Sequence, residues 1–195
     1  MMSKASWKYL FLGLVTINVI ALVTVIILIN LPANDEEISK IDRKDQGVSF
    51  VINTNRDDLN TLISQYIEKE GLAGSVHYDV YLSDVVELYG TMPFFGRDIE
   101  LKLTFVPEAQ SNGDVVLKQE SVSVGQLNLP VSYVLNFINR QYKTPDWVTI
   151  QPDKEQIYVS LQNMELKSDV KVKAKEFDLK NDKISFVLTV PSLQP

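Results

Sequence analysis

The chain has 195 residues, of which 45% are hydrophobic and 23% charged, with no cysteine, one histidine and a formal net charge of −6. The missing cysteine excludes disulfides, a lipoprotein thioether anchor, a cysteine nucleophile and thiolate metal sites, and one histidine cannot build a multi-histidine metal site. All 25 acidic residues and 17 of the 19 basic residues follow Asn34, so that part carries 17 − 25 = −8. Such an acidic domain is a poor candidate for nucleic-acid binding.

The first predicted element is a transmembrane anchor over residues 9–31. This stretch contains no charged residue, and at about 1.5 Å per residue it crosses a hydrocarbon core of about 30 Å. Trp7 stands at its near boundary, as interfacial aromatic residues do, and Pro32 marks its far end. We therefore expect a single-pass protein of the cell membrane.

The charges on either side of this anchor set its orientation. Lys4 and Lys8 precede it, and three acidic residues at positions 35–37 follow it. Since basic residues stay in the cytoplasm, residues 1–8 are predicted to be a cytoplasmic N-terminus and the rest of the chain to be extracytoplasmic. The alternative is a cleaved signal peptide, whose apolar region runs about 7–15 residues before a small-x-small site. The longer apolar run favours an uncleaved anchor.

The polar and charged residues 32–47 are predicted to form a linker, and residues 48–195 one extracytoplasmic domain. A domain of about 150 residues buries about 68–70% of its unfolded surface. Its first element is a short strand of alternating residues over 48–53. The sequence TNRD at 54–57 is interpreted as a capping box, which begins an amphipathic helix with one apolar stripe over 59–67.

Four strands joined by short loops follow and predict an antiparallel meander, over residues 76–83, 85–92, 99–105 and 115–124. A second helix is expected after Pro130, and it is apolar over more than half its girth, so it is deeply buried or faces an apolar ligand. The last strands are predicted over 147–150, 156–164, 166–179 and 184–190. This order predicts an α+β fold, with a long curved antiparallel sheet wrapped around two helices.

Few residues have the pattern of an enzyme. His77 is the only histidine, and neither a serine motif nor an oriented carboxylate accompanies it. Asp84 and Glu87 resemble a paired-carboxylate site, but Asp84 falls in a predicted turn, where aspartate commonly forms local hydrogen bonds. Phosphate-binding and metal-ligand spacings are missing as well. We therefore predict no catalytic residue, no metal and no cofactor, which disfavours an enzyme.

Two surfaces are candidates for binding. The only uneven charge feature is a group of four lysines: Lys167, Lys171, Lys173 and Lys175. They are interpreted either as a solvated strand face that protects a sheet edge or as a basic strip for lipid head groups or another anionic surface. The second surface is a groove for an acyl chain between the apolar helix and the concave sheet. Its candidate lining residues, which are also typical of a packed core, are Tyr133, Leu135, Phe137, Ile138 and Trp147.

Several segments carry a family resemblance. They are VYLSD at 80–84, ELYGT at 87–91, SVGQLNLPVSYV at 123–134, PDWV at 145–148 and AKEFDL at 174–179. Together with the anchor and the short acidic linker, they resemble the YpmS family of Gram-positive bacteria, formerly a domain of unknown function. The resemblance covers essentially the whole chain, and GQLNLP at 125–130 is its most specific part.

The resemblance implies a Firmicutes cell envelope and a possible association with an SGNH-type hydrolase, and it offers no catalytic residues to carry over. The order of helices and strands is also similar to tubular lipid-binding (TULIP-like) domains, by analogy of topology alone. We expect a membrane-anchored binding protein that holds an apolar or lipid-type ligand, such as a phospholipid or lipoteichoic acid. The alternative expectation is a non-catalytic scaffold for another envelope protein, such as that hydrolase.

Overall fold

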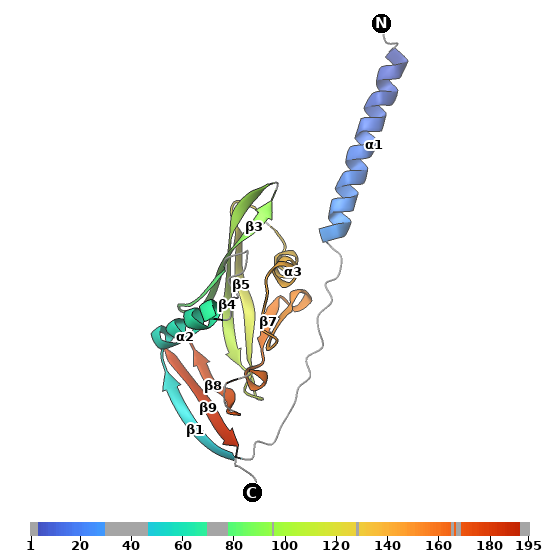
Figure 1. The fold of residues 1–195 in the computed structure, drawn as a ribbon. Coiled ribbons are helices and arrows are strands. Elements are labelled where there is room, and N and C mark those ends of the chain that lie inside the picture. The colour runs from blue at the N-terminus through green and yellow to red at the C-terminus, as the bar shows by residue number, and fades with distance from the viewer. Residues whose placement is uncertain are drawn as a thin grey trace. The chain divides into compact units, whose positions relative to one another are not determined.

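The computed structural model describes residues 4–29, 47–69, 78–94, 96–127, 129–164, 166 and 169–191. The chain divides into two compact units, residues 1–32 and 33–195, and each is described by itself. Figure 1 shows a single helix in the first unit and curved sheets with short helices in the second. Most of the predicted linker lies outside the described residues, as do His77 and Lys167.

Helix α1 (Lys4–Ile29) covers most of the predicted anchor. Every side chain in it from residue 12 to residue 24 is exposed. The hydroxyls of Thr16 and Thr24 and the amide of Asn18 each donate to the carbonyl four residues earlier, at 2.9 Å, so the helix satisfies these groups itself. In the described part of the chain, no helix has the length and hydropathy that crossing a membrane requires. The helix is confirmed, and its place in a membrane stays a prediction.

The second unit is an α+β domain of antiparallel sheets, as expected. A six-stranded sheet has the order β2-β3-β4-β5-β7-β6. Its strands are β2 (Asp79–Leu82), β3 (Val86–Phe94), β4 (Arg97–Ala109), β5 (Val115–Val124), β6 (Val148–Gln151) and β7 (Gln156–Val159). A three-stranded sheet has the order β1-β9-β8, with strands β1 (Gly47–Thr54), β8 (Lys171–Asp178) and β9 (Lys183–Pro191).

The expectation of one continuous sheet is wrong. The chain leaves the six-stranded sheet after β7, because residues 160–163 turn back on themselves. The Asn163 N–H donates to the Ser160 carbonyl at 3.1 Å, and the Asn163 side-chain amide donates to the Ser160 hydroxyl at 3.0 Å. The short 3₁₀ helix η2 (Leu161–Asn163) replaces the end of the predicted strand over 156–164. The final two strands then pair with each other, and β9 pairs with β1, instead of extending the meander.

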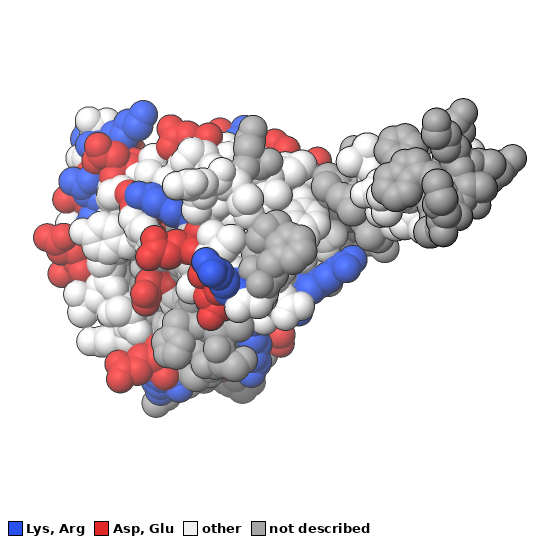
Figure 2. Space-filling model, turned by 90° about the horizontal axis from the view of Figure 1, so that it is seen from above, with Lys and Arg blue, Asp and Glu red and all other residues white. Residues whose placement is uncertain are grey.

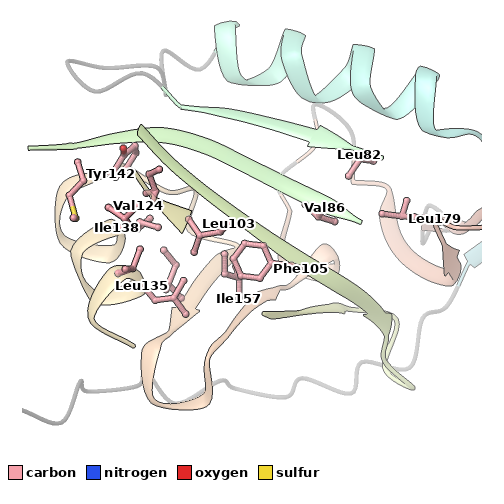
Figure 3. Packing of buried hydrophobic residues seen from close by; sticks show 14 of the residues in the cluster. Leu82, Val86, Leu103, Phe105, Val124, Leu135, Ile138, Tyr142, Ile157 and Leu179 are labelled. Carbon is pink, nitrogen blue, oxygen red and sulfur yellow. The ribbon is translucent and has the colours of Figure 1, made fainter. Parts of the chain in front are cut away.

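The core lies between the six-stranded sheet and helix α3 (Val131–Gln141). From α3, Val134 and Leu135 are 0% exposed and Ile138 is 3% exposed. The sheet contributes the alternating residues Leu101, Leu103 and Phe105 of β4 to the same cluster. Figure 3 shows Leu103 and Phe105 beside Leu135 and Ile138 of α3. The wide apolar girth of this helix is therefore matched largely by protein side chains, which is the buried alternative of the sequence prediction.

Helix α2 (Arg56–Lys69) lies beside the edge strand β2 rather than inside the sheet, and none of its residues is fully buried. The side chain of Asn60 bonds the β2 backbone twice: it donates to the Leu82 carbonyl at 2.9 Å and accepts the Leu82 N–H at 2.7 Å. The expected capping box is displaced by one residue, because Asn55 accepts the Asp58 N–H at 2.8 Å. The prediction that both helices lie within one wrapped sheet is thus wrong for α2.

Tyr142 joins the end of α3 to strand β3. Its hydroxyl donates to the Thr91 carbonyl at 2.6 Å and accepts the Thr91 N–H at 3.1 Å. Strand β2 pairs with β3 only as far as Tyr89, so the hydroxyl takes the place of a missing strand partner. Gly90 makes room for it, since a Cβ there would stand 2.7 Å from the Tyr142 hydroxyl oxygen.

Candidate functional site

The three-stranded sheet has one apolar face. Directly opposed residues of antiparallel strands place their side chains on the same face. The register gives three apolar rows: Val48–Val190, Phe50–Leu188–Val172 and Ile52–Phe186–Ala174. The alternate rows are largely polar: Ser49–Thr189–Lys171, Val51–Val187–Lys173 and Asn53–Ser185–Glu176. The two faces of this sheet are therefore chemically distinct.

Exposure along the apolar rows rises from β8 to β1. Val172 and Ala174 on β8 are 8% and 7% exposed, whereas Phe50 and Ile52 on β1 are 55% and 44% exposed. Val48 and Val190 at the far end are open as well. A contiguous open apolar patch on a folded domain marks a binding surface or an aggregation hazard. We call this patch the open apolar face, and it consists of Val48, Phe50, Ile52, Leu188 and Val190.

The predicted basic strip lies on the opposite face of the same sheet. Lys171 and Lys173 belong to the polar rows. Lys175 is the extra residue of a β-bulge between Ala174 and Glu176. Gly113, in the β4–β5 turn, packs against Lys173, because a Cβ on Gly113 would meet the Lys173 Cβ at 2.5 Å. Lys171 and Lys173 therefore lie on the face opposite the open apolar face, and with Lys175 in the bulge the three lysines do not form one evenly spaced row.

The five predicted groove residues have different environments. Leu135 and Ile138 are core residues, and an acyl chain would reach them only if the core opened. Phe137 packs edge-to-face on Tyr142, with 6.3 Å between ring centroids, and Trp147 packs on Tyr66 of α2 at 5.8 Å. Tyr133 is 38% exposed. These side chains thus have separate surroundings: two lie in the core, two pack on other rings, and one is partly exposed.

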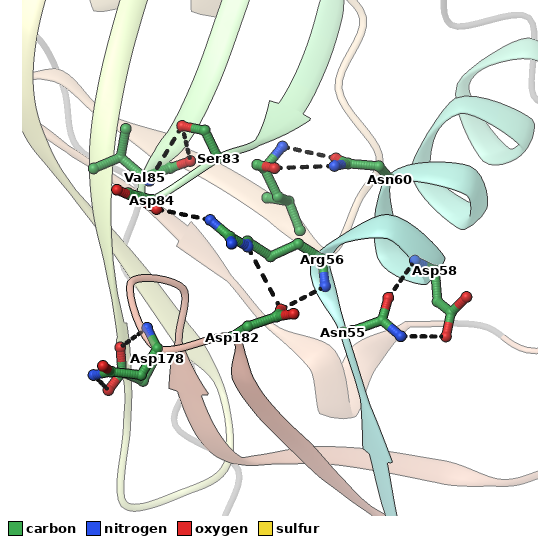
Figure 4. Close-up of polar contacts among 11 residues, drawn as sticks. Asn55, Arg56, Asp58, Asn60, Ser83, Asp84, Val85, Asp178 and Asp182 are labelled. Carbon is green, nitrogen blue, oxygen red and sulfur yellow. Dashed lines mark hydrogen bonds and ion pairs between the residues drawn. The ribbon is translucent and has the colours of Figure 1, made fainter.

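The predicted carboxylate pair is divided between two different clusters. Arg56 Nη1 lies 2.7 Å from Asp84 Oδ1, and Arg56 Nε lies 3.5 Å from Asp182 Oδ1 (Figure 4). The Arg56 N–H also donates to Asp182 at 2.8 Å. This arginine therefore ties the start of α2 to turns of both sheets, a structural role that leaves Asp84 paired rather than poised for acid–base chemistry.

Glu87 belongs to a cluster on the outer face of the six-stranded sheet. Its carboxylate accepts the Tyr89 hydroxyl, pairs with Lys102 Nζ at 2.9 Å and accepts the Ser83 hydroxyl at 2.8 Å. These contacts, the Tyr89 hydrogen bond first, lower the pKa of Glu87 from 4.5 to about 2. Lys102 also lies 5.0 Å from the centroid of the Tyr89 ring. A carboxyl with so low a pKa is unsuited to proton donation near neutral pH.

Because of this pKa, we expect Glu87 to contribute to acid stability. The folded state keeps the carboxylate ionised down to pH about 2, whereas the unfolded chain takes up a proton near pH 4.5. Its contribution is therefore complete above that pH and is lost as the pH falls toward 2. Glu87→Gln should flatten the fall of unfolding free energy in this window, measured by urea unfolding. The exposed Glu100→Gln on β4 is the control, and equal acid profiles for both variants would contradict the prediction.

A polar cavity of about 330 Å³ lies at the end of the β4–β5 hairpin, and its lining includes Lys118, Gln151 and Tyr158. Much of its polar lining is already paired: Lys118 Nζ lies 2.8 Å from Glu108, and the Gln156 amide donates to Gln151 at 2.6 Å. None of the five predicted groove residues lines this cavity. On the face of the domain shown in Figure 2, acidic and basic side chains are interspersed.

Sequence reasoning identified the strand over 48–53 but missed its exposed apolar face. The alternation of Val48, Phe50 and Ile52 predicts a strand with one apolar side, and by itself that pattern indicates burial. The signal that distinguishes this strand is its edge position beside β9, which depends on pairing between the two ends of the domain. Only the fold supplies that information.

The comparisons with known proteins agree on the family. A family model described as "Uncharacterized protein conserved in bacteria (DUF2140)" matches residues 5–190. The "Uncharacterized protein YpmS" of Bacillus subtilis (strain 168) is 29% identical over 180 residues, which cover 92% of this chain and 95% of that protein. No solved structure matches. Because the match extends over nearly the whole chain, this protein belongs to the DUF2140 family, which includes YpmS.

Proposed function

We propose that this protein is a membrane-anchored, extracytoplasmic binding module that holds the acyl chain of a lipid on the open apolar face. The observation that carries the proposal is the continuity of that face. Three neighbouring rows hold only aliphatic and aromatic side chains, and their β1 members are about half exposed. A strand advances about 3.4 Å per residue, so the rows from Val48 to Ile52 span about 14 Å, a length that suits part of an acyl chain.

The apolar surface of α1 supports the anchoring part of the proposal. Leu12, Leu14, Ile17 and Leu22 are each about 60–67% exposed, and they do not form a single stripe. A helix that is apolar on all sides needs an apolar surrounding. The internal hydrogen bonds of Thr16, Asn18 and Thr24 suit such a surrounding, because lipid offers no partners to polar groups. The basic residues Lys4 and Lys8 at the start of the helix favour a cytoplasmic N-terminus.

The ligand class follows from the chemistry of the face. Its rows carry no ionisable group, and each buried CH₂ contributes about 0.8 kcal/mol, so an aliphatic chain suits it better than a polar polymer. The three apolar rows hold no lysine, so the face itself offers no charged partner to a head group. Phospholipids and lipoteichoic acid both carry such chains. The alternative is a non-catalytic accessory role, in which an apolar segment of another envelope protein, such as an SGNH-type hydrolase, covers the same face.

Photo-crosslinking with a phospholipid that carries a photoactivatable acyl chain tests this proposal on the full-length protein in membranes. Val48→Ser removes an exposed valine from the open apolar face, and Val51→Ser removes a comparably exposed valine, at 61% against 53%, from the opposite face of the same strand. We expect Val48→Ser to lower lipid labelling about threefold to tenfold and Val51→Ser to leave it unchanged. Equal labelling of both variants would overturn lipid binding here. Displacement of the probe by a co-purifying protein would favour the accessory role.

A further inference from the structure

Among the residues that the structure describes, the outer edge of β1 is open, whereas the outer edges of β2 and β8 are partly covered. Asn60 pairs with the backbone of Leu82 along the free edge of β2. The Gly113 carbonyl accepts the Ala174 N–H at 2.7 Å along the free edge of β8. Strand β1 bonds β9 on one side, and on its other side the described residues supply no hydrogen bond. With respect to the described part of the chain, its outward N–H and C=O groups can therefore accept another strand.

Strand β1 also lacks the devices by which proteins protect an open edge. Natural edge strands carry lysine, proline, a bulge or an inward-pointing charge, or they are very short. The sequence GVSFVINT at 47–54 contains no charged residue and no proline. Its eight residues pair with β9 in an unbroken register. A long, regular, uncharged edge is suited to pairing with a further strand.

We infer that β1 pairs with the β1 strand of a second copy of this chain, antiparallel and about a two-fold axis. The lack of charge makes a second copy a suitable partner. An antiparallel pair of identical strands opposes like with like near its centre, so a strand of this kind pairs with itself only if it carries no charge there. Strand β1 meets that condition along its whole length. The result is a six-stranded sheet that spans two copies, with the order β8-β9-β1-β1-β9-β8.

The same pairing doubles the open apolar face. Side chains opposed across the new edge share a face. Three registers place Phe50 opposite an apolar residue of the second copy, which is Val48, Phe50 or Ile52. In each of them the apolar rows run through both molecules. One pair of eight-residue strands is a small interface. Confinement of the copies by a shared membrane raises their effective concentration. Only this gain in effective concentration rests on the proposed membrane anchor. The geometry of the strand pairing does not depend on the anchor.

Disulfide scanning in intact membranes tests the inference directly, because the chain has no native cysteine. Single cysteines are placed at each position of β1 from Val48 to Asn53 and, as a control, at the exposed Ser111 in the β4–β5 turn. Mild oxidation should give a dimer band that is strongest near the strand centre and varies with position, while Ser111→Cys gives none. Crosslinks only to a protein of another mass, or equal crosslinking at every position, would overturn the inference.

A charged substitution separates strand pairing from mere proximity in the membrane. Val51→Lys adds a charge on an exposed β1 side chain, and Val106→Lys makes the same change at an exposed position on β4. In a Ser49→Cys background, Val51→Lys should lower the dimer fraction about fivefold, and Val106→Lys should leave it unchanged. Circular dichroism of the two lysine variants checks that they are folded. Carbonate extraction of the membranes checks separately that the protein is anchored. An unchanged dimer fraction in folded Val51→Lys would exclude β1 pairing.

Discussion

Gly90→Ala is expected to lower the free energy of unfolding by about 2–3 kcal/mol, as overpacking of a rigid core site does. The new methyl group would stand 2.7 Å from the Tyr142 hydroxyl oxygen. That oxygen cannot simply move away, because it both donates to and accepts from the Thr91 backbone. Tyr142 is 8% exposed and is enclosed by the core. The clash must therefore displace the end of α3, strand β3 or both.

A double-mutant cycle that combines Gly90→Ala with Tyr142→Phe tests whether the contact between these two residues causes the loss of stability. Tyr142→Phe alone leaves the Thr91 N–H and carbonyl without their partner and should cost about 1–3 kcal/mol. In that background the oxygen is gone, so Gly90→Ala should cost less than about 1 kcal/mol. Thermal or urea unfolding of the full chain in detergent, followed by circular dichroism, gives all four values. If the two single effects simply add, the contact between Gly90 and Tyr142 is not the source of the destabilisation.

Asp114→Ala is expected to be comparably destabilising, by about 3 kcal/mol, because it leaves several buried donors unpaired. The Asp114 side chain is 3% exposed, and its carboxylate accepts the Tyr158 hydroxyl at 2.6 Å and the Asn112 amide at 2.8 Å. Its second oxygen faces the Gln162 N–H at 3.4 Å. One carboxylate therefore joins the β4–β5 turn, strand β7 and helix η2, and its loss releases all three segments.

Tyr158→Phe is the graded comparison for Asp114→Ala. It removes one donor and leaves the carboxylate its other contacts, so it should cost about 1–1.5 kcal/mol. Burial and the neighbouring carboxylate raise the pKa of Tyr158 to about 12, so its hydroxyl stays protonated throughout the usual pH range. Unfolding in urea at neutral pH gives both values. Equal stability of Asp114→Ala and the unsubstituted protein would show that water replaces the carboxylate and that the network is not needed.

Local structure was predicted well because it depends on neighbours in the sequence. The strand-helix-strand order of the domain agrees with the structure, including the Asn112-Gly113 turn and the helix after Pro130. The helix cap was placed one residue early, since Thr54 and Asn55 are both good capping residues and only the backbone geometry selects Asn55. Period-two spacing likewise placed Lys175 beside Lys173, because a β-bulge leaves no mark in the pattern.

Long-range pairing could not be predicted from the sequence. Nothing in the spacing of residues 156–179 shows that the chain changes sheets, because that change depends on where β1 lies. The apolar girth of α3 was recognised, but whether Leu135 faces a ligand or Leu103 depends on the curvature of the sheet. The candidate site has the same limit. An alternating pattern predicts a strand with one buried face, and only the pairing of the strands determines that the Phe50 side chain is exposed.

The pairing of β1 with β9 has a consequence for biogenesis. The first strand of the domain and the last lie side by side, and β9 is the central strand of its sheet. Neither β1 nor β8 has a neighbour in that sheet until the residues of β9 have been synthesised. The three-stranded sheet can therefore complete its fold only once β9 is available, and a premature stop codon before β9 would disable both ends of the domain at once.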